Sequence, residues 1–364
     1  MTKKPRVLLF LRLPPRLTGA TLMNSFVYES ELLKENFNIK TLRVPHAKSH
    51  DTFGEKSVKK LTGIIATQFK LFFTLLTFRP KFVYFQISPL GGAFLRDFLF
   101  VAVIKMLRTR ILYHMHGKGI AKEQNRKYFK KLYKFVFKKE QVICLSNSLT
   151  QDIADVYNGT PYIVPNVIKR ETINFPEREL DKPLKILFVS NLFIFKGIHV
   201  FIDALELLNN KNISFEAHIV GSEAEETEIS LSSILTNKGL ADTVKYLGPK
   251  FDSEKWEEYK WANVLVFPTL NDIWGLVILE AMQAGIPVIA SIDGAIPEII
   301  DDNKTGFLVE QGNAQQICNK LEYLHNNRDK LKNMGEQGKR KFNSTYAYEQ
   351  FEINMLNTFK KACN

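Results

Sequence analysis

The sequence predicts an α/β protein made of two doubly wound domains that face each other across a cleft. The length of 364 residues exceeds one ordinary α/β domain and suits two. Short runs of β-branched and aromatic residues alternate with longer amphipathic stretches, which is typical of βαβ units and a parallel sheet. The alternation stops at a polar, proline-containing stretch, residues 169–183, and then starts again. Two such domains joined by a linker place a cleft between them.

In the first half, five strands are expected, at Arg6–Leu11, Phe82–Gln86, Arg110–Met115, Gln141–Leu145 and Tyr162–Val164. The helices expected between them are Thr21–Glu35, Ala93–Leu107, Lys122–Lys138 and Leu149–Tyr157. In the second half the expected strands are Leu184–Ser190, Ser214–Val220, Val244–Leu247, Val264–Phe267, Pro287–Ala290 and Gly306–Leu308. Helices are expected at Val200–Asn209 and Glu225–Asn237, between the later strands, and through the polar-faced end, Ala314–Lys361.

These elements predict an N-terminal domain of residues 1–168, a linker of residues 169–183 and a C-terminal domain of residues 184–345. A final helix, residues 346–364, is expected to return to the N-terminal domain. Three widely spaced cysteines, Cys144, Cys318 and Cys363, form no Cys-x-x-Cys pair, so a reducing, cytoplasmic compartment is expected. The most lipid-like stretch, Leu61–Phe78, contains Gln68 and Lys70 and is interpreted as interfacial at most. The apolar run near the N-terminus is interpreted as a buried strand and not as a signal peptide.

Charge is divided unevenly between the halves. Residues 1–180 hold 31 Lys and Arg against 13 Asp and Glu, whereas residues 181–364 hold 19 against 25. A basic half attracts phosphate, which occurs in nucleic acids, anionic lipid headgroups and phosphorylated substrates. The basic stretch from Lys118 to Lys139 is interleaved with apolar positions 129, 132, 133 and 136 on one helical face. One interpretation is a helix whose apolar side packs on the core and whose basic side faces solvent. The other is a helix that binds peripherally to an anionic membrane.

The most informative segment runs from Pro268 to Ala290 and reads PTLNDIWGLVILEAMQAGIPVIA. A strand leads through a loop into a helix that begins near Gly275. The N-terminus of a helix offers unpaired N–H groups and a positive dipole end, which suit a diphosphate. Glu280, more than a turn into the helix, is placed to reach hydroxyls beyond the phosphates. Asp272, before the helix, is placed to point toward a sugar.

This segment resembles the signature of the family 4 glycosyltransferases, which have two Rossmann-like domains in the GT-B fold. The resemblance implies that Glu280 holds the donor ribose, that Asp272 contacts the transferred sugar, and that the backbone amides of Gly275, Leu276 and Val277 hold the phosphates. Asp272 stands where the family usually has Glu, so its reach toward the sugar is shorter by roughly one carbon.

Other segments follow the order of the family. Ser190–Gly197 reads SNLFIFKG, in which Lys196 would neutralise the departing phosphate and Asn191 replaces the Arg of many relatives. Glu298 opens a further helix and is assigned to the donor site. In the first half, PPRLTGAT resembles the loop that closes over phosphates and acceptor, through Thr18, Gly19 and Ala20. The segment YHMHGKG supplies His116, expected near the transferred sugar, and Pro165–Asn166 resembles the end of the first domain.

No Asp-x-Asp sequence occurs, so the chelating pattern of the other large glycosyltransferase fold is missing. We therefore expect neither cofactor nor metal, with the leaving charge met by Lys196 and backbone dipoles. The expected reaction moves a sugar, with retention, from a nucleotide sugar to a glycan or lipid-linked acceptor hydroxyl, as in bacterial polysaccharide or glycolipid synthesis. The expected catalytic residues are Asp272, Lys196 and His116.

Other interpretations of these residues stay open. Asp272, Glu280 and Lys196 are also compatible with solvated surface positions, and Glu298 with a first-turn acid that favours its helix dipole. His114 and His116 are compatible with structural histidines at a strand end, and Gly19 with a plain turn. Two other functions remain: a nucleotide-sugar epimerase, or an impaired nucleotide-sugar-binding or basic anion-binding protein. The basic stretch lacks a recognisable nucleic-acid module, so no nucleic acid partner is expected.

Overall fold

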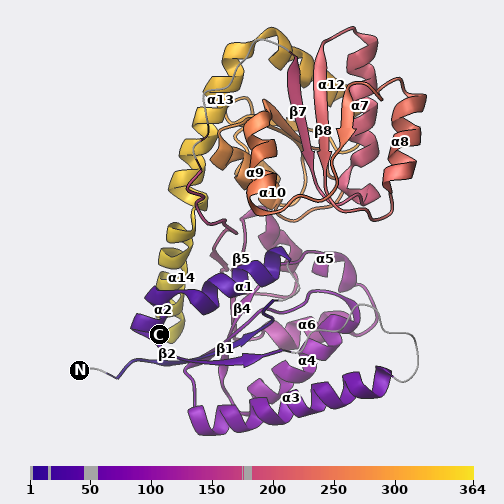
Figure 1. Cartoon of the computed structure of the whole chain (residues 1–364). Helices are drawn as coiled ribbons and strands as arrows, with labels where there is room; N and C mark the ends of the chain where they lie inside the picture. Colours follow the sequence, from indigo (N-terminus) through magenta and orange to yellow (C-terminus); the bar gives the residue numbers. More distant parts are fainter. Residues whose placement is uncertain (1–2, 15–17, 45–55, 174, 176–182) are drawn as a thin grey trace. The chain divides into compact units, whose positions relative to one another are not determined.

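The computed structural model describes residues 3–14, 18–44, 56–173, 175 and 183–364 (Figure 1). The chain divides into two compact units. Unit 1 contains residues 1–166 and 348–364, and unit 2 contains residues 167–347. Each unit is built on its own six-stranded sheet, and all strand pairs in both sheets are parallel. The expected fold class, two doubly wound α/β domains, is confirmed.

The sheet of unit 1 has the strand order β2-β1-β3-β4-β5-β6. Its strands are β1 (Arg6–Leu11), β2 (Asn38–Arg43), β3 (Phe82–Phe85), β4 (Arg110–His114), β5 (Gln141–Cys144) and β6 (Tyr162–Ile163). The central strands are buried on both faces, because helices cover both sides of the sheet. The register pairs Val7 with Ile39 on one side and with Phe82 on the other.

The helices of unit 1 form a layer on each face of this sheet. One face is covered by α3 (Lys56–Phe78), α4 (Gly91–Met106) and α6 (Phe129–Phe137), whose buried side chains share one core cluster. The other is covered by α1 (Gly19–Glu29), α2 (Glu31–Asn36) and α14 (Tyr348–Cys363). Figure 1 shows the yellow helix α14 beside the indigo helices α1 and α2. Two short helices, α5 (Ile120–Glu123) and η1 (Ser148–Ile153), contact each other.

The sheet of unit 2 has the strand order β12-β11-β10-β7-β8-β9. Its strands are β7 (Leu184–Val189), β8 (Phe215–Val220), β9 (Val244–Tyr246), β10 (Val264–Phe267), β11 (Val288–Ser291) and β12 (Gly306–Val309). Its helices are η2 (Ile194–Lys196), α7 (Ile198–Asn210), α8 (Glu228–Asn237), α9 (Asp252–Trp261), α10 (Leu276–Ala284), α11 (Ile296–Ile299), α12 (Ala314–Asn326), α13 (Arg328–Lys341) and η3 (Phe342–Tyr346). Helices α7, α8 and α12 pack on one core cluster, whereas α9 and α10 contact β7, β10 and β11.

The strand order reverses once in each sheet. In unit 2 the first strand, β7, lies between β8 and β10, so the chain runs outward to β9 and then returns to the other side of β7. In unit 1 the first strand, β1, lies between β2 and β3. In open α/β sheets, ligands bind outside the carboxyl ends of the strands at such a reversal. The two reversals therefore mark where each unit is built to hold a ligand.

Several expected elements of unit 1 were wrong in detail. The expected helix Thr21–Glu35 is two helices, because Ser30 ends α1 and its hydroxyl accepts a hydrogen bond from the Leu33 amide to start α2. The expected helix Lys122–Lys138 is likewise broken into α5 and α6, and Tyr128 between them has a φ of 71°. The expected helix Leu149–Tyr157 is the short 3₁₀ helix η1. Strand β2 was not expected at all.

Candidate functional site

The loops that follow β7 and β10 are joined at the reversal point of unit 2. The Phe195 carbonyl accepts hydrogen bonds from the Leu270 amide (2.8 Å) and the Asn271 amide (3.3 Å). Gly197, with a φ of 83°, starts α7 against the same loop: a Cβ atom there would lie 1.9 Å from the Pro268 carbonyl oxygen. Only glycine permits this approach. The fold thus brings together two segments that lie some seventy residues apart in the sequence.

This junction places Lys196 beside Asp272. The Lys196 Nζ lies 2.5 Å from Asp272 Oδ2, with the two side chains 22% and 16% exposed. The other carboxylate oxygen of Asp272, Oδ1, accepts hydrogen bonds from the amides of Ile273 (2.7 Å) and Trp274 (3.1 Å). Asp272 therefore fixes the loop before α10 and orients the ammonium group toward it.

Helix α10 begins directly after this loop. Its N-cap residue, Gly275, has a φ of 76°, and among the described residues no side chain caps the helix. Leu276 and Val277 form its first turn, where the amides point out of the helix end. These amides form the positive end of the α10 dipole, and the loop that leads into them carries Asp272, which pairs with Lys196.

Glu280 lies one turn further along α10 and is held by helix α9. Its Oε1 lies 2.6 Å from Lys255 Nζ, and its Oε2 accepts a hydrogen bond from the Tyr259 hydroxyl at 2.8 Å. Burial raises the pKa of Tyr259 well above its usual value, and the Glu280 charge raises it further, so the phenol stays a donor. Lys255 and Tyr259 were not predicted from the sequence, although their spacing of four residues places both on one side of a helix.

Asn191 and Glu298 also lie in unit 2. Asn191 Oδ1 accepts a hydrogen bond from the Ser222 amide at 3.2 Å, which ties the loop after β7 to the loop after β8. Glu298 lies in α11, and its backbone carbonyl accepts hydrogen bonds from Lys341 Nζ and the Tyr346 hydroxyl. The loop before α11 reaches the site through Asp293, whose Oδ2 accepts the Asp272 amide at 2.6 Å.

The predicted residues of the first half lie in unit 1. Thr18 caps α1: its hydroxyl accepts the Thr21 amide at 3.2 Å, and the Thr21 hydroxyl accepts the Thr18 amide in return. Gly19 and Ala20 are therefore the first two residues of an 11-residue helix. The preceding part of the predicted loop, residues 15–17, lies outside the described residues.

His114 is the last residue of β4 and His116 follows two positions later, with the two rings 4.0 Å apart. His114 is fully buried, and its Nδ1 lies 2.5 Å from the Tyr84 hydroxyl, which favours a structural role. Both ring nitrogens of His116 are buried. Burial lowers the pKa of His116 to about 3, against an opposing effect of Asn166, so its ring is neutral. A neutral imidazole suits the supporting role predicted for it.

A polar cluster that sequence analysis missed lies at the reversal point of unit 1. Asp97, fully buried in α4, is paired with Arg12 at 2.6 Å and with Arg96 at 2.8 Å. Asp97 Oδ2 also accepts the Ser88 amide at 2.8 Å. Two guanidinium groups on one carboxylate leave a net positive charge at the carboxyl ends of β1 and β3.

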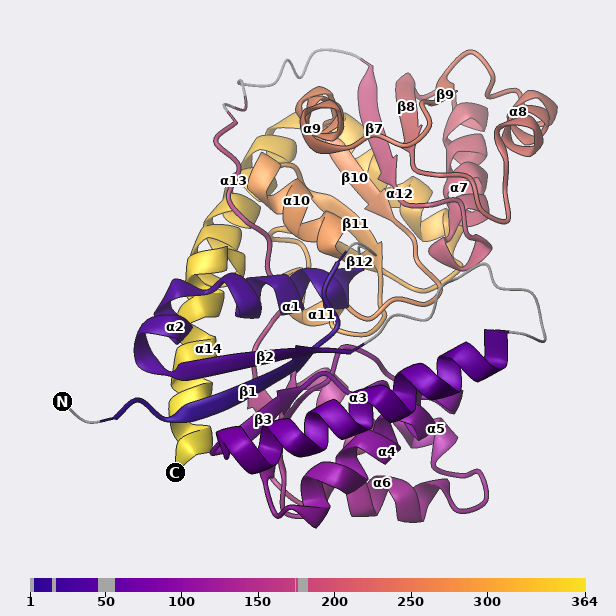
Figure 2. The same ribbon diagram turned by 60° about the horizontal axis from the view of Figure 1, so that its bottom comes forward.

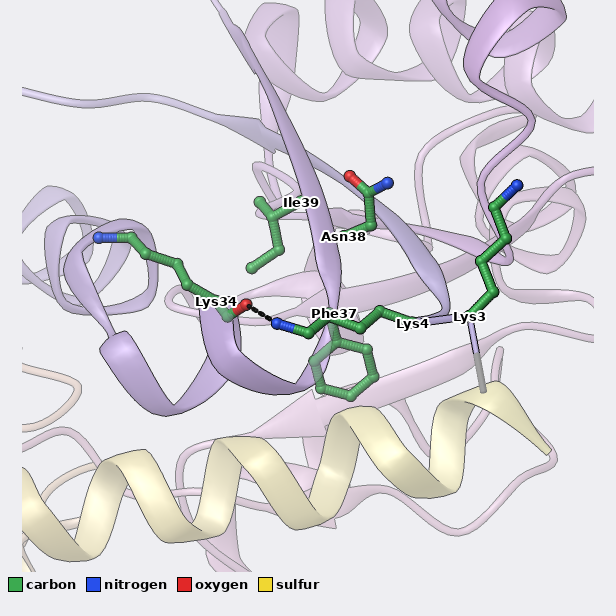
Figure 3. A pocket seen from close by; sticks show the side chains of 6 residues that line it. All are labelled: Lys3, Lys4, Lys34, Phe37, Asn38 and Ile39. Carbon is green, nitrogen blue, oxygen red and sulfur yellow. Dashed lines mark hydrogen bonds between the residues drawn. The ribbon is translucent and has the colours of Figure 1, made fainter. Parts of the chain in front are cut away.

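Two surface hollows in unit 1 lie at the opposite, amino ends of the strands. One, of about 480 Å³, is lined by Lys3, Lys4, Lys34, Phe37, Asn38 and Ile39 (Figure 3). There the Lys4 Nζ donates to the Lys34 carbonyl at 3.3 Å. Neither hollow includes a predicted site residue. Across the described residues, no three His, Cys, Asp or Glu side chains converge to hold a metal ion, and no helix is long and apolar enough to cross a bilayer.

Comparisons with known proteins match this chain to glycosyltransferases. Residues 169–341 match the family described as Glycosyl transferases group 1. The amylovoran biosynthesis glycosyltransferase AmsK of Erwinia amylovora is 30% identical over 226 residues, 59% of this chain and 55% of that protein. The capsular polysaccharide biosynthesis glycosyltransferase CapM of Staphylococcus aureus is 31% identical over 179 residues, 48% of this chain and 46% of that protein. The matches span about half the length of these relatives.

The fold is also shared with solved structures of low sequence identity. The structure of HepE from Anabaena in complex with UDP superposes with a TM-score of 0.72. The alignment covers 98% of this chain and all of that one, at 15% identity. This likeness shows that the two chains share the GT-B fold.

Proposed function

Residues 169–341 belong to the Glycosyl transferases group 1 family, and from this premise we propose that the protein is a retaining hexosyltransferase. In the proposed reaction a nucleotide sugar donates its sugar to a glycan or lipid-linked acceptor hydroxyl. The observation that carries the proposal is the junction at the reversal point of unit 2. There Lys196, Asp272 and the uncapped start of α10 lie on adjacent loops.

The proposed donor site assigns one task to each group. The first-turn amides of α10 and the Lys196 ammonium bind the diphosphate, whose charge grows as it leaves. Glu280, oriented by Lys255 and Tyr259, accepts hydrogen bonds from the ribose hydroxyls. Asp272 holds the loop and faces the transferred sugar. HepE in complex with UDP, on the same fold, supports a nucleoside diphosphate as the ligand.

We propose that transfer proceeds on one face of the sugar. The bond from the anomeric carbon to the phosphate oxygen breaks, and the acceptor oxygen bonds the same carbon from the same side. The acceptor proton passes to the departing phosphate oxygen. Protein groups stabilise charge in this scheme and need not act as a nucleophile, and His116 in its neutral form supports the reacting sugar.

The class of acceptor is proposed from the relatives and from charge. AmsK and CapM are named for amylovoran and capsular polysaccharide biosynthesis, which supports a bacterial glycan acceptor. The basic first half of the sequence suits an acceptor carried on an anionic membrane, with the enzyme associated peripherally with its cytoplasmic face. Catalysis without a metal is also part of the proposal.

The donor site is tested by thermal shift with UDP-, GDP- and ADP-sugars in EDTA. We expect one base class to raise the melting temperature of the wild type in EDTA, and Glu280→Gln to lose most of that rise. Glu254→Gln, an exposed acid on α9, is the matched control and keeps the rise. No shift with any nucleotide sugar contradicts the donor site, and a shift that requires a divalent metal contradicts metal-independent binding.

The reaction is tested once the base is known. Proton NMR of the first product formed on an oligosaccharide acceptor reports the anomeric configuration, which we expect to match that of the donor. An inverted product contradicts retention. Conversion of the donor to an epimer without any acceptor identifies an epimerase instead.

A further inference from the structure

Helices α3 and α4 of unit 1 each present a row of exposed apolar side chains. The members recur every three to seven positions, so each row follows one side of its helix. They are Ile65, Phe69, Phe73 and Leu76 on α3, and Leu95, Leu99 and Met106 on α4. Phe69 is 62% exposed and Met106 64%. Single exposed apolar residues are ordinary, but two neighbouring rows are not.

Helices α3 and α4 cover the same face of the sheet, and both apolar rows lie on the side of the helix that faces away from the sheet. Leu71 and Leu75 of α3 and Phe100 and Ile104 of α4 share one core cluster with β1, β3 and β4. The opposite sides of the two helices therefore face outward together. The helices also pack against each other, and α3 lies at the outside of unit 1 in both Figure 1 and Figure 2. We call this surface the α3–α4 face.

The exposed charges around the α3–α4 face are mostly positive. Between residues 56 and 122 the sequence holds a single acid, Asp97, against twelve Lys and Arg. Asp97 is fully buried and paired with Arg12 and Arg96, so it does not offset the surface cations. Glu140 pairs with one of the twelve cations, Lys105, and its side chain is only 7% exposed. Outward-facing helix surfaces usually carry both signs of charge. This one carries apolar and basic side chains.

A basic hollow lies where both rows end. It measures about 520 Å³ and lies beside Leu76, at the end of the α3 row, and close to the C-terminus of α4. Four cations line it, Arg79, Lys81, Arg108 and Arg110, and none of the described residues lining it is acidic. Cations near helix C-termini are favoured by the helix dipoles, and one per helix would suffice for that. Four around one hollow also suit a phosphate group.

We propose that the α3–α4 face docks on an anionic phospholipid bilayer. The two apolar rows enter the boundary between headgroups and acyl chains, and the hollow receives a lipid phosphate. A second copy of the chain is a poorer occupant, because two such faces would bring cations against cations. The lipid supplies the opposite charge and the apolar layer at once.

The basic stretch from Lys118 to Lys139 was open to two interpretations, a core-facing helix or a membrane-docking helix. Phe129, Tyr133 and Val136 of α6 are buried in the core, which favours the first interpretation. Helix α6 contributes exposed lysines beside the face and one exposed aromatic side chain, Phe135, whose ring contacts Phe98 of α4. The apolar part of the interaction belongs to α3 and α4.

Vesicle flotation of the full chain tests the proposal without any donor or acceptor, so its outcome is independent of the proposed reaction. The vesicles are phosphatidylcholine alone, or phosphatidylcholine mixed with phosphatidylglycerol. We expect the wild type to float only with the mixed vesicles, and less at high salt. Phe69→Ser/Phe73→Ser is expected to lower partitioning about tenfold or more by loss of apolar burial. Arg79→Gln/Arg108→Gln is expected to lower it about twenty-five-fold, at about fivefold per cation.

Matched controls on unit 2 keep the test specific. Ile229→Ser/Phe251→Ser removes two exposed apolar side chains, and Lys245→Gln/Lys304→Gln removes two exposed cations. Both controls are expected to float like the wild type, and unchanged thermal unfolding shows that each variant is folded. Equal flotation of all variants, or no flotation of the wild type, overturns the proposal. So does lipid-free dimerisation that Phe69→Ser/Phe73→Ser abolishes, which would assign the face to a second copy.

Discussion

Lys196 faces two competing partners in the proposed reaction. A diphosphate that binds its ammonium group competes with the Asp272 carboxylate, which lies 2.5 Å away. Asp272→Asn removes the competing charge but leaves a side chain of the same size. We therefore expect this variant to bind the nucleoside diphosphate about tenfold more tightly, since a hydrogen bond to a charged group contributes about 1.5 kcal/mol or more. Transfer should slow by about a hundredfold, because the loop and the sugar contact are altered.

Isothermal titration with the nucleoside diphosphate and initial rates of transfer measure the two effects. The matched control is Glu322→Gln, which frees Lys211 from a pair of the same length, 2.5 Å, on the surface of unit 2. That variant is expected to change neither quantity. Weaker diphosphate binding by Asp272→Asn would show that the carboxylate assists the phosphate site instead of competing for Lys196.

His116 makes unit 1 sensitive to acid. Burial lowers its pKa to about 3, whereas in the unfolded chain it titrates near 6.5. Below pH 6.5 His116 therefore binds a proton in the unfolded state but not in the folded state, so the free energy of unfolding falls as the pH falls. Between pH 7.5 and 5.5 this one group accounts for about 1.4 kcal/mol of lost stability. Urea unfolding at both pH values should show a smaller loss for His116→Gln; an equal loss in both proteins would contradict a neutral buried imidazole.

Among individual site residues, the sequence could predict those that lie in recognisable motifs. Glu280, Asp272 and Lys196 were singled out because their neighbours match a known signature, and the structure joins Lys196 to Asp272. Lys255 and Tyr259 were missed because they act on Glu280 from another helix. Arg12 and Asp97 lie 85 positions apart in the sequence, and no local sequence pattern predicts that they pair.

The start of helix α7 depends on one glycine. Gly197 has a φ of 83°, and a Cβ there would lie 1.9 Å from the Pro268 carbonyl oxygen. Gly197→Ala therefore forces α7 and the loop after β10 apart, which should cost about 3 kcal/mol or more of unfolding free energy. It should also weaken nucleotide binding, because the displaced loop leads to Asp272. Chemical denaturation and thermal shift measure these effects.

Gly239→Ala is the matched control for this substitution. Gly239 also has a positive φ, 67°, but a Cβ there would meet nothing within 4 Å. Its loss should be about 1 kcal/mol, the cost of the backbone conformation alone. Similar losses in the two variants would show that the close approach to Pro268 is relieved without cost.

Elements were predictable where their apolar pattern was strong. The buried parallel strands of both units were expected within one or two residues, because such strands are apolar on both faces. Strand β2 was missed because it is an edge strand that pairs only with β1 and reads NIKTLR, a polar and half-exposed sequence. The break between α1 and α2 was missed because Ser30 caps a helix inside a continuous amphipathic pattern.

Unit 1 needs the last helix of the chain. Phe359 of α14 packs its ring against Phe37, Phe82 and Tyr84, and Phe351 packs against Phe26. Deletion of residues 348–364 exposes this apolar layer. We expect the deletion to abolish cooperative unfolding of unit 1 and to leave the unfolding of unit 2 unchanged, because unit 2 is one continuous segment.

Calorimetry and limited proteolysis of the deletion variant measure the two units separately. Residues 348–364 joined ahead of residue 3 through a flexible linker should restore the unfolding of unit 1. Persistence of both transitions in the deletion variant would show that α14 adds little to the core. Two α/β units were predictable from the repeated alternation of elements, whereas the packing of α14 depends on aromatic contacts across more than 270 residues.

The discontinuity of unit 1 has a consequence for biosynthesis. A ribosome translates the strands of unit 1 before unit 2, and α14 only after all of unit 2. Unit 2 can fold as soon as its own segment emerges, but Phe82 and Tyr84 lack their cover until α14 has been translated. Unit 1 therefore starts to emerge before unit 2 and is completed after it. During that interval the uncovered aromatic face of unit 1 is the part of the nascent chain that is exposed both to chaperone binding and to aggregation.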